Sequence, residues 1–111
     1  MKPSMITTGL EIPGYKILRP VGIVRGIVVR SRSVVGQFMA GLQTVFGGNI
    51  TVYTNLCERA RTDTYSLMCQ QAEKNGANAI IAMRYDTTEI IRGVTEVLCY
   101  GTAVVVEEIK P

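Results

Sequence analysis

The chain has 111 residues, with 12 Lys and Arg against 9 Asp and Glu, and it contains neither histidine nor tryptophan. Its 47% apolar and 19% charged content predicts one globular domain over residues 1–111 and excludes a disordered, collagen-like or disulfide-stapled chain. The lack of histidine excludes Ser-His-Asp catalysis and His-ligated zinc. A formal net charge of +3 is only mildly basic, so we expect no nucleic-acid partner.

The first third of the sequence predicts a short β segment, a loop and a long strand. Residues Met5 to Thr8 are β-rich, and the glycines and proline between Gly9 and Gly14 indicate a loop. Apolar residues then alternate from Tyr15 to Arg30 at the period of a strand. Pro20 cannot donate to a ladder, so it predicts an edge position or a bulge. Gly26 suggests bending or the close approach of another backbone.

Three arginines near the end of this strand form the densest basic cluster: Arg25, Arg30 and Arg32. We interpret them as the solvated end of a strand, and contact with phosphate or another polyanion is the alternative. Arg25 is therefore a candidate for a ligand or an interface contact.

A stretch without charged residues runs from Ser33 to Cys57. Polar residues and glycines interrupt it throughout, so we reject a membrane span, and the N-terminus lacks the apolar stretch of a signal peptide. A cytoplasmic protein is expected. Ser33 to Phe46 predicts a short amphipathic helix, ended by Gly47 and Gly48. These two glycines are interpreted as a helix-ending signal rather than a phosphate loop, since they lack its lysine and its glycine spacing.

A second helix is predicted from about Thr51 to Asn75, and Gly76 is a suitable residue to end it. It carries Cys57 and Cys69, which lie roughly 18 Å apart along the helix axis and cannot chelate one ion within a protomer. Together with Cys99 they are interpreted as free thiols that pack as small apolar groups, with the largest packing loss expected at Cys57. The three cysteines remain weak candidates for metal ligands.

Three β segments are predicted after the helix, over Ala79–Asp86, about Glu89–Tyr100 and Gly101–Ile109. Gly101 should mark a bend or a bulge. The run from Thr102 to Val106 is apolar on both faces, so we expect this strand to lie buried between two layers. The predicted order of elements is therefore β-β-α-α-β-β.

Arg84 and Asp86 are two residues apart and should lie on one face of a strand. We interpret them as a charge pair at an interface, because unpaired buried charges are costly. A catalytic acid assisted by arginine is the alternative. Asp86 or Glu89 could supply oxygen ligands to a hard cation, although nothing in the sequence requires one.

A set of short motifs occurs in order along the chain: Ile6-Thr7-Thr8, Gly22-Ile23-Val24-Arg25-Gly26, Phe46-Gly47-Gly48, Ala60-Arg61, Gly76-Ala77-Asn78-Ala79-Ile80, Arg84-Tyr85-Asp86 and Gly101-Thr102-Ala103-Val104. With this ordered set the chain resembles the YbjQ-like family of small bacterial and archaeal proteins from about Met5 to Val106. The resemblance implies an α+β fold with a β-α-β-β core similar to the dodecin subunit, assembled as a homopentameric ring. It also implies a heavy-metal-binding label, in a family whose biochemical function is not established.

We therefore expect a ring-forming α+β domain in which an antiparallel or mixed sheet packs on one long helix, with an extra short helix. The expected role is an oligomeric binding or scaffold protein rather than an enzyme. Heavy-metal binding is the alternative, and an enzyme using Arg84 and Asp86 at a subunit boundary is the third. The expected partners are further copies of the chain and a small ligand or metal ion, with no membrane and no resident cofactor besides that ion.

Overall fold

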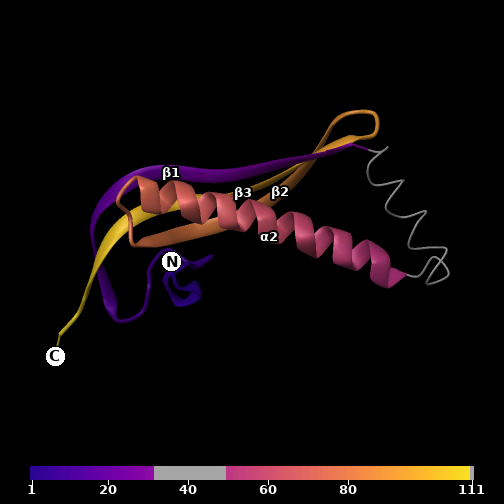
Figure 1. Cartoon of the computed structure of the whole chain (residues 1–111). Helices are drawn as coiled ribbons and strands as arrows, with labels where there is room; N and C mark the ends of the chain where they lie inside the picture. The colour runs from indigo at the N-terminus through magenta and orange to yellow at the C-terminus, as the bar shows by residue number, and fades with distance from the viewer. Residues whose placement is uncertain (32–49, 111) are drawn as a thin grey trace.

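The computed structural model describes residues 1–31 and 50–110, which form one helix and one three-stranded sheet (Figure 1). The described elements are the short 3₁₀ turn η1 (Pro3–Met5), strand β1 (Tyr15–Ser31), helix α2 (Ile50–Lys74), strand β2 (Ala79–Ile91) and strand β3 (Val94–Glu108). The expected α+β class is confirmed. The short helix expected over Ser33–Phe46 and the glycines Gly47 and Gly48 lie outside the described residues.

Strand β3 occupies the centre of the sheet, with β1 and β2 antiparallel on either side. Helix α2 lies across one face (Figure 1), and Ala103 points into the buried cluster on that side. On the opposite face Val104 and Val106 pack against Ile12 of the N-terminal segment. The second half of β3 is therefore covered on both faces, as its two-sided apolar sequence predicted.

The N-terminal segment also extends the edge of β2. Ile6 forms a parallel bridge with Ile80, and the amide of Thr7 donates to the Ile80 carbonyl at 3.0 Å. The β segment predicted from Met5 to Thr8 is thus reduced to one bridge, since η1 occupies its start. The loop expected between Gly9 and Gly14 is confirmed.

The predicted boundaries of the last three β segments were wrong. One hairpin replaces them, because Ile91 pairs with Val94 and the turn between them contains Gly93 at φ 82°. Thr87 and Thr88, which lay between two of the predicted segments, belong to an exposed part of β2. Gly101 lies in the middle of β3, where an added Cβ would come within 2.7 Å of the Ile80 Cγ2 atom.

The bulge expected near Gly101 is present in the neighbouring strand. The register of β2 on β3 shifts between Ile81 and Arg84, and Ala82 adopts φ 54° there. Gly101 of β3, which has no side chain, therefore lies opposite the extra residue of the bulge in β2. Pro20 likewise lies between two register shifts in edge strand β1, which confirms the prediction of an edge position or a bulge at this proline.

Helix α2 begins and ends within one residue of the predicted limits. Gly76 follows it at φ 86°, and the Ala77 amide donates to the Ala72 carbonyl at 3.0 Å, a pattern typical of a glycine-ended helix. The Asn78 side chain then exchanges two hydrogen bonds with the backbone of Val106, at 2.8 and 2.9 Å. These contacts give the Gly76-to-Ile80 motif a structural role.

No helix in residues 1–31 and 50–110 is long and apolar enough to cross a bilayer.

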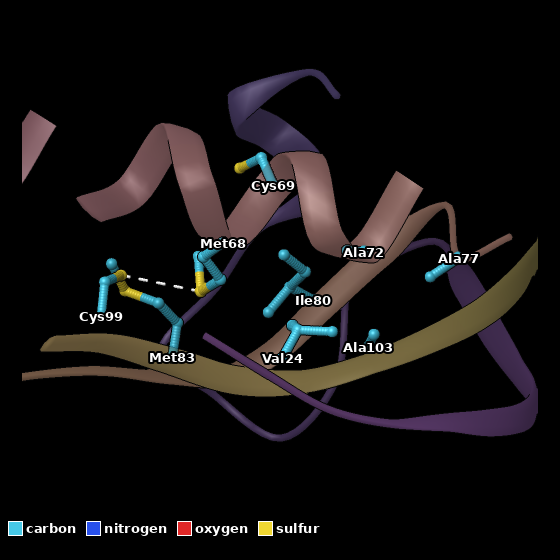
Figure 2. Close-up of a cluster of buried hydrophobic side chains, with 9 residues drawn as sticks. All are labelled: Val24, Met68, Cys69, Ala72, Ala77, Ile80, Met83, Cys99 and Ala103. Carbon is cyan, nitrogen blue, oxygen red and sulfur yellow. Dashed lines mark hydrogen bonds between the residues drawn. The ribbon is translucent and has the colours of Figure 1, made fainter. Parts of the chain in front are cut away.

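The main core lies between α2 and the sheet (Figure 2). Its buried members are Val24, Met68, Cys69, Ala72, Ala77, Ile80, Met83, Cys99 and Ala103. The absence of a side chain at Gly26 lets β1 and α2 approach each other closely. An added Cβ at Gly26 would lie 2.0 Å from the Thr64 carbonyl oxygen, so the expected close approach at this glycine is confirmed.

We predict that Gly26→Ala destabilises the fold strongly, because the helix backbone must move to admit one methyl group. Overpacking of this kind typically costs about 1–3 kcal/mol of unfolding free energy. Gly9→Ala is the matched control, since its added Cβ would meet the Thr7 hydroxyl oxygen at an ordinary 3.4 Å. Urea denaturation should show a lower midpoint for Gly26→Ala and a nearly unchanged one for Gly9→Ala. Equal midpoints would contradict the close approach.

Candidate binding cleft

A cleft of about 770 Å³ lies where the first half of α2 diverges from the β2–β3 hairpin. Figure 1 shows this divergence between the helix and the hairpin tip. The described residues that line the cleft come from β1, α2 and the hairpin: Arg30, Leu56, Cys57, Ala60, Arg61, Thr87, Glu89, Arg92, Gly93, Thr95 and Val97. Its volume lies in the range typical of small-molecule sites.

The register of the sheet explains the floor of the cleft. Arg30 pairs with Thr95, and Thr95 pairs with Glu89, so these three residues form one row across the sheet. Thr87 and Val97 are paired in the row nearer the core. Paired residues of antiparallel strands point to the same face, so both rows face α2.

The wall of the cleft is one side of α2. Leu56, Cys57, Ala60 and Arg61 are spaced at i, i+1, i+4 and i+5, which places them on one helical face. Leu56 is half-buried and Ala60 is buried, whereas the Cys57 thiol is exposed. The wall is therefore apolar near the core and also carries an exposed thiol.

Two of the three arginines of the cleft are held in place by neighbouring groups. Arg30 Nη2 lies 3.1 Å from Asp63 Oδ2, and the Arg61 guanidinium stacks 5.3 Å from the centre of the Tyr85 ring. Among the described residues Arg92 makes no ion pair, and it lies in the exposed hairpin turn. The cleft therefore presents guanidinium groups from a strand, a helix and a turn.

Among the described lining residues one is acidic, and its side chain supports the hairpin turn. Glu89 Oε1 accepts a hydrogen bond from the Gly93 amide at 3.1 Å. This contact commits part of the carboxylate to the backbone. Glu89 was proposed as a ligand for a hard cation, but three arginines share its cleft.

The sequence-predicted candidates Arg25, Arg84 and Asp86 lie on the other face of the sheet. Arg25 and Arg84 both pair with Tyr100, and Asp86 pairs with Leu98 in the next row. All three charged residues are exposed, and none lines the cleft. The structure thus brings them to one surface, which we call the open sheet face.

Arg84 and Asp86 do not pair with each other within the chain. Arg84 Nη1 donates to the carbonyl oxygens of Thr8 and Met83 at 2.7 and 2.8 Å, whereas Asp86 Oδ1 accepts from the Thr87 amide at 2.9 Å. Arg84 therefore holds the N-terminal segment against β2. The expected Arg–Asp couple is replaced by two separate contacts to the backbone.

The three cysteines occupy different environments. Cys57 is exposed, so the expectation that its replacement would cause the largest packing loss was wrong, while Cys69 and Cys99 are buried in the core. Cys99 Sγ lies 3.6 Å from Met68 Sδ, and Cys69 lies apart from this pair (Figure 2). Burial raises the pKa of the Cys69 thiol and raises that of Cys99 to about 11, with Cys69 adding to the shift at Cys99.

Comparison with known proteins identifies one family. Residues 4–107 match the model of the YbjQ-like family, described as "Putative heavy-metal-binding". A UPF0145 protein of Chromobacterium violaceum is 62% identical over 104 residues, covering 94% of this chain and 89% of that protein. A UPF0145 protein of Burkholderia mallei is 65% identical over 102 residues, with 92% of each chain covered.

A solved structure supports the fold. A protein of unknown function from Pediococcus pentosaceus, assigned to the DUF74 family, aligns with a TM-score of 0.59 at 17% identity. The alignment covers 92% of this chain and 96% of that one. At this identity the similarity concerns the fold alone.

The described residues do not fit the heavy-metal label. No group of three or more cysteine, aspartate or glutamate side chains within residues 1–31 and 50–110 could hold a metal ion. The buried thiols have raised pKa values and are therefore protonated at neutral pH, whereas thiolates are the form that binds metals. Cys57 lies instead at a cleft lined by three arginines.

We predict that a maleimide at pH 7.5 labels Cys57 rapidly and labels Cys69 and Cys99 only after unfolding. Exposure controls access, and the raised pKa values keep the buried thiols unreactive. Mass spectrometry of the native protein should show one rapid adduct, which Cys57→Ser abolishes. Three adducts at similar rates would contradict the placement of the cysteines.

We also predict a loss of stability in alkali that depends on Cys99. Burial raises the pKa of this thiol from 9.0 to about 11, so between these values the unfolded chain releases a proton that the folded chain keeps. The contribution is complete below pH 9.0 and is lost as the pH rises to about 11. Denaturation at several pH values should give a shallower decline for Cys99→Val than for wild type. Cys57→Ser should keep the wild-type decline, and identical curves for all three proteins would contradict the assignment.

Proposed function

The chain belongs to the YbjQ-like family, and from this premise we propose that it is a self-assembling binding protein whose copies associate through the open sheet face. The observation that carries this proposal is the exposure of apolar side chains along β1. Ile23 is 79% exposed, Val29 is 52% exposed and Ile27 is 40% exposed. Together with Arg25 they form the outer side of one strand.

The open sheet face has the composition of an interface. Its row of Arg25, Tyr100 and Arg84 adjoins the row of Ile27, Leu98 and Asp86, so apolar and charged groups alternate across the strands. A contiguous exposed apolar patch on a soluble protein typically marks a contact surface. The charges on this face can then select the register of the neighbouring copy.

Among residues 1–31 and 50–110, no helix lies on the open sheet face. Strand β1 has 17 residues and spans about 56 Å, so it offers a long surface on this face. The helix covers the opposite face, and the N-terminal segment covers the region near Val104. A second copy is the simplest cover for the remaining surface.

A ring requires that the open sheet face of one copy contact a different surface of the next. Such a contact is heterologous, and heterologous contacts close into rings when the rotation permits. The family resemblance makes five the expected number of copies. A homopentamer of 12.1 kDa chains has a mass of about 60 kDa.

The proposed role is binding rather than catalysis. Arg84 and Asp86, the pair considered for an enzyme, are engaged with backbone groups rather than aimed into the cleft. The ligand-binding part of the proposal rests on the cleft beside α2. No nucleic acid or membrane partner is part of the proposal.

We predict a mass near 60 kDa, five times 12.1, by light scattering on a sizing column at micromolar concentration. Ile23→Asp should dissociate the assembly, because it places a charge at the most exposed apolar position of β1. Leu10→Asp is the matched control, since Leu10 is 75% exposed on the N-terminal loop, and it should leave the mass unchanged. A stable 12.1 kDa wild-type chain would contradict the assembly.

The same untagged protein tests the metal alternative. After incubation with zinc or copper and dialysis, metal analysis should show less than one ion per chain. Stoichiometric metal that disappears in the triple variant Cys57→Ser, Cys69→Ala and Cys99→Ala would favour the metal role over the one proposed here.

A further inference from the structure

We propose that the cleft between α2 and the β2–β3 hairpin binds a small organic anion with an apolar body. This inference names a ligand class for the proposed binding function and rests on it, but it does not depend on the ring. The anionic group would lie among the guanidinium groups of Arg30, Arg61 and Arg92, and the body would lie against the apolar wall.

The charges of the lining favour an anion over a cation. Among the described residues of the lining, three arginines and one glutamate give a formal charge of 3 − 1 = +2. Counting Asp63, which pairs with Arg30 from outside the lining, still leaves +1. A cation would have to overcome this field, whereas an anion is attracted by it.

The arginines are arranged to receive an anion. Asp63 fixes Arg30 from one side, and the Tyr85 ring supports Arg61, so neither side chain must be ordered from a free state on binding. Arginine presents several N–H donors in a planar fork, which suits carboxylate and phosphate oxygens. Arg92, in the exposed hairpin turn, also lines the cleft.

The rest of the lining indicates an apolar body rather than a bare ion. Leu56, Ala60 and Val97 supply apolar contacts, and Ala60 and Val97 are buried beside the core. The hydroxyls of Thr87 and Thr95 on the floor provide further polar contacts. A volume of about 770 Å³ exceeds what inorganic phosphate would need and fits a drug-sized molecule.

The test uses phenyl phosphate and benzoate as probes, with inorganic phosphate and neutral benzyl alcohol as their truncated counterparts. Isothermal titration on the full-length protein should show tighter binding of an aromatic anion than of either counterpart. Affinity should fall as the salt concentration rises, because the contacts are between charges. Tighter binding of phenyl phosphate than of benzoate would identify the anionic group of the ligand as a phosphate, and the reverse order would identify it as a carboxylate.

Arg92→Gln should weaken binding of the aromatic anion by roughly ten-fold, the effect of losing one charge-assisted contact. Arg92 lies in an exposed turn, so this variant should fold normally. Arg25→Gln is the matched control on the open sheet face and should bind as wild type does. Leu56→Ala should lower the affinity for phenyl phosphate and leave the affinity for inorganic phosphate unchanged.

Three results would overturn the inference: no binding of either aromatic anion at millimolar concentration, equal loss in Arg92→Gln and Arg25→Gln, or binding of benzyl alcohol as tight as that of phenyl phosphate. The sizing column separates this inference from the assembly. A 60 kDa ring, five times 12.1, that binds no aromatic anion contradicts the ligand class alone. A monomer that binds phenyl phosphate through Arg92 supports the cleft and contradicts the ring.

Discussion

The close contact between α2 and β1 at Gly26 is the constraint on which the rest of the structure depends. An added Cβ would lie 2.0 Å from the Thr64 carbonyl oxygen and 2.8 Å from the Met68 amide, so the two backbones touch without a side chain between them. The contact fixes where the helix crosses the sheet. On one side of it, α2 covers the core between Met68 and Ala72. On the other side the helix diverges from the hairpin, and the cleft forms between them (Figure 1).

One helix on one side of the sheet leaves two surfaces partly uncovered. One is the open sheet face, on the side away from α2, where Ile23, Ile27 and Val29 are exposed. The other is the inner face where α2 diverges from the hairpin, which becomes the floor of the cleft. The first surface is apolar with scattered charges and suits a second copy, whereas the second is rich in arginine and suits a small anion. The same strands therefore carry both proposed surfaces, on opposite faces of the sheet.

The elements with strong local signals could be predicted from the sequence, and the cleft could not. The helical period and Gly76 located α2, and Pro20 marked the irregular part of β1. The hairpin turn was missed because the polar residues of outer β2 resemble a loop when no helix covers them.

The basic cluster in the sequence of β1 did not predict the position of the cleft, and the reason is geometric. Arg25 and Arg30 are five residues apart in one strand, so their side chains lie on opposite faces of the sheet. Arg25 lies on the open sheet face, and Arg30 lines the cleft. Arg61 and Arg92 join Arg30 through helix packing and strand register, which no local sequence signal shows.

The sulfur atoms of the core are better understood as packing than as ligands. Met68, Met83 and Cys99 belong to the buried cluster between α2 and the sheet, and thioethers and thiols adapt well to irregular spaces in a core. Burial keeps the Cys99 thiol protonated, so a metal would first have to displace a proton inside a dry core. The groups that can meet a ligand without such a cost are the arginines at the cleft. Arg30 in the cleft and Val29 on the open face are neighbours in one strand, so the two proposed surfaces share β1 as their common element.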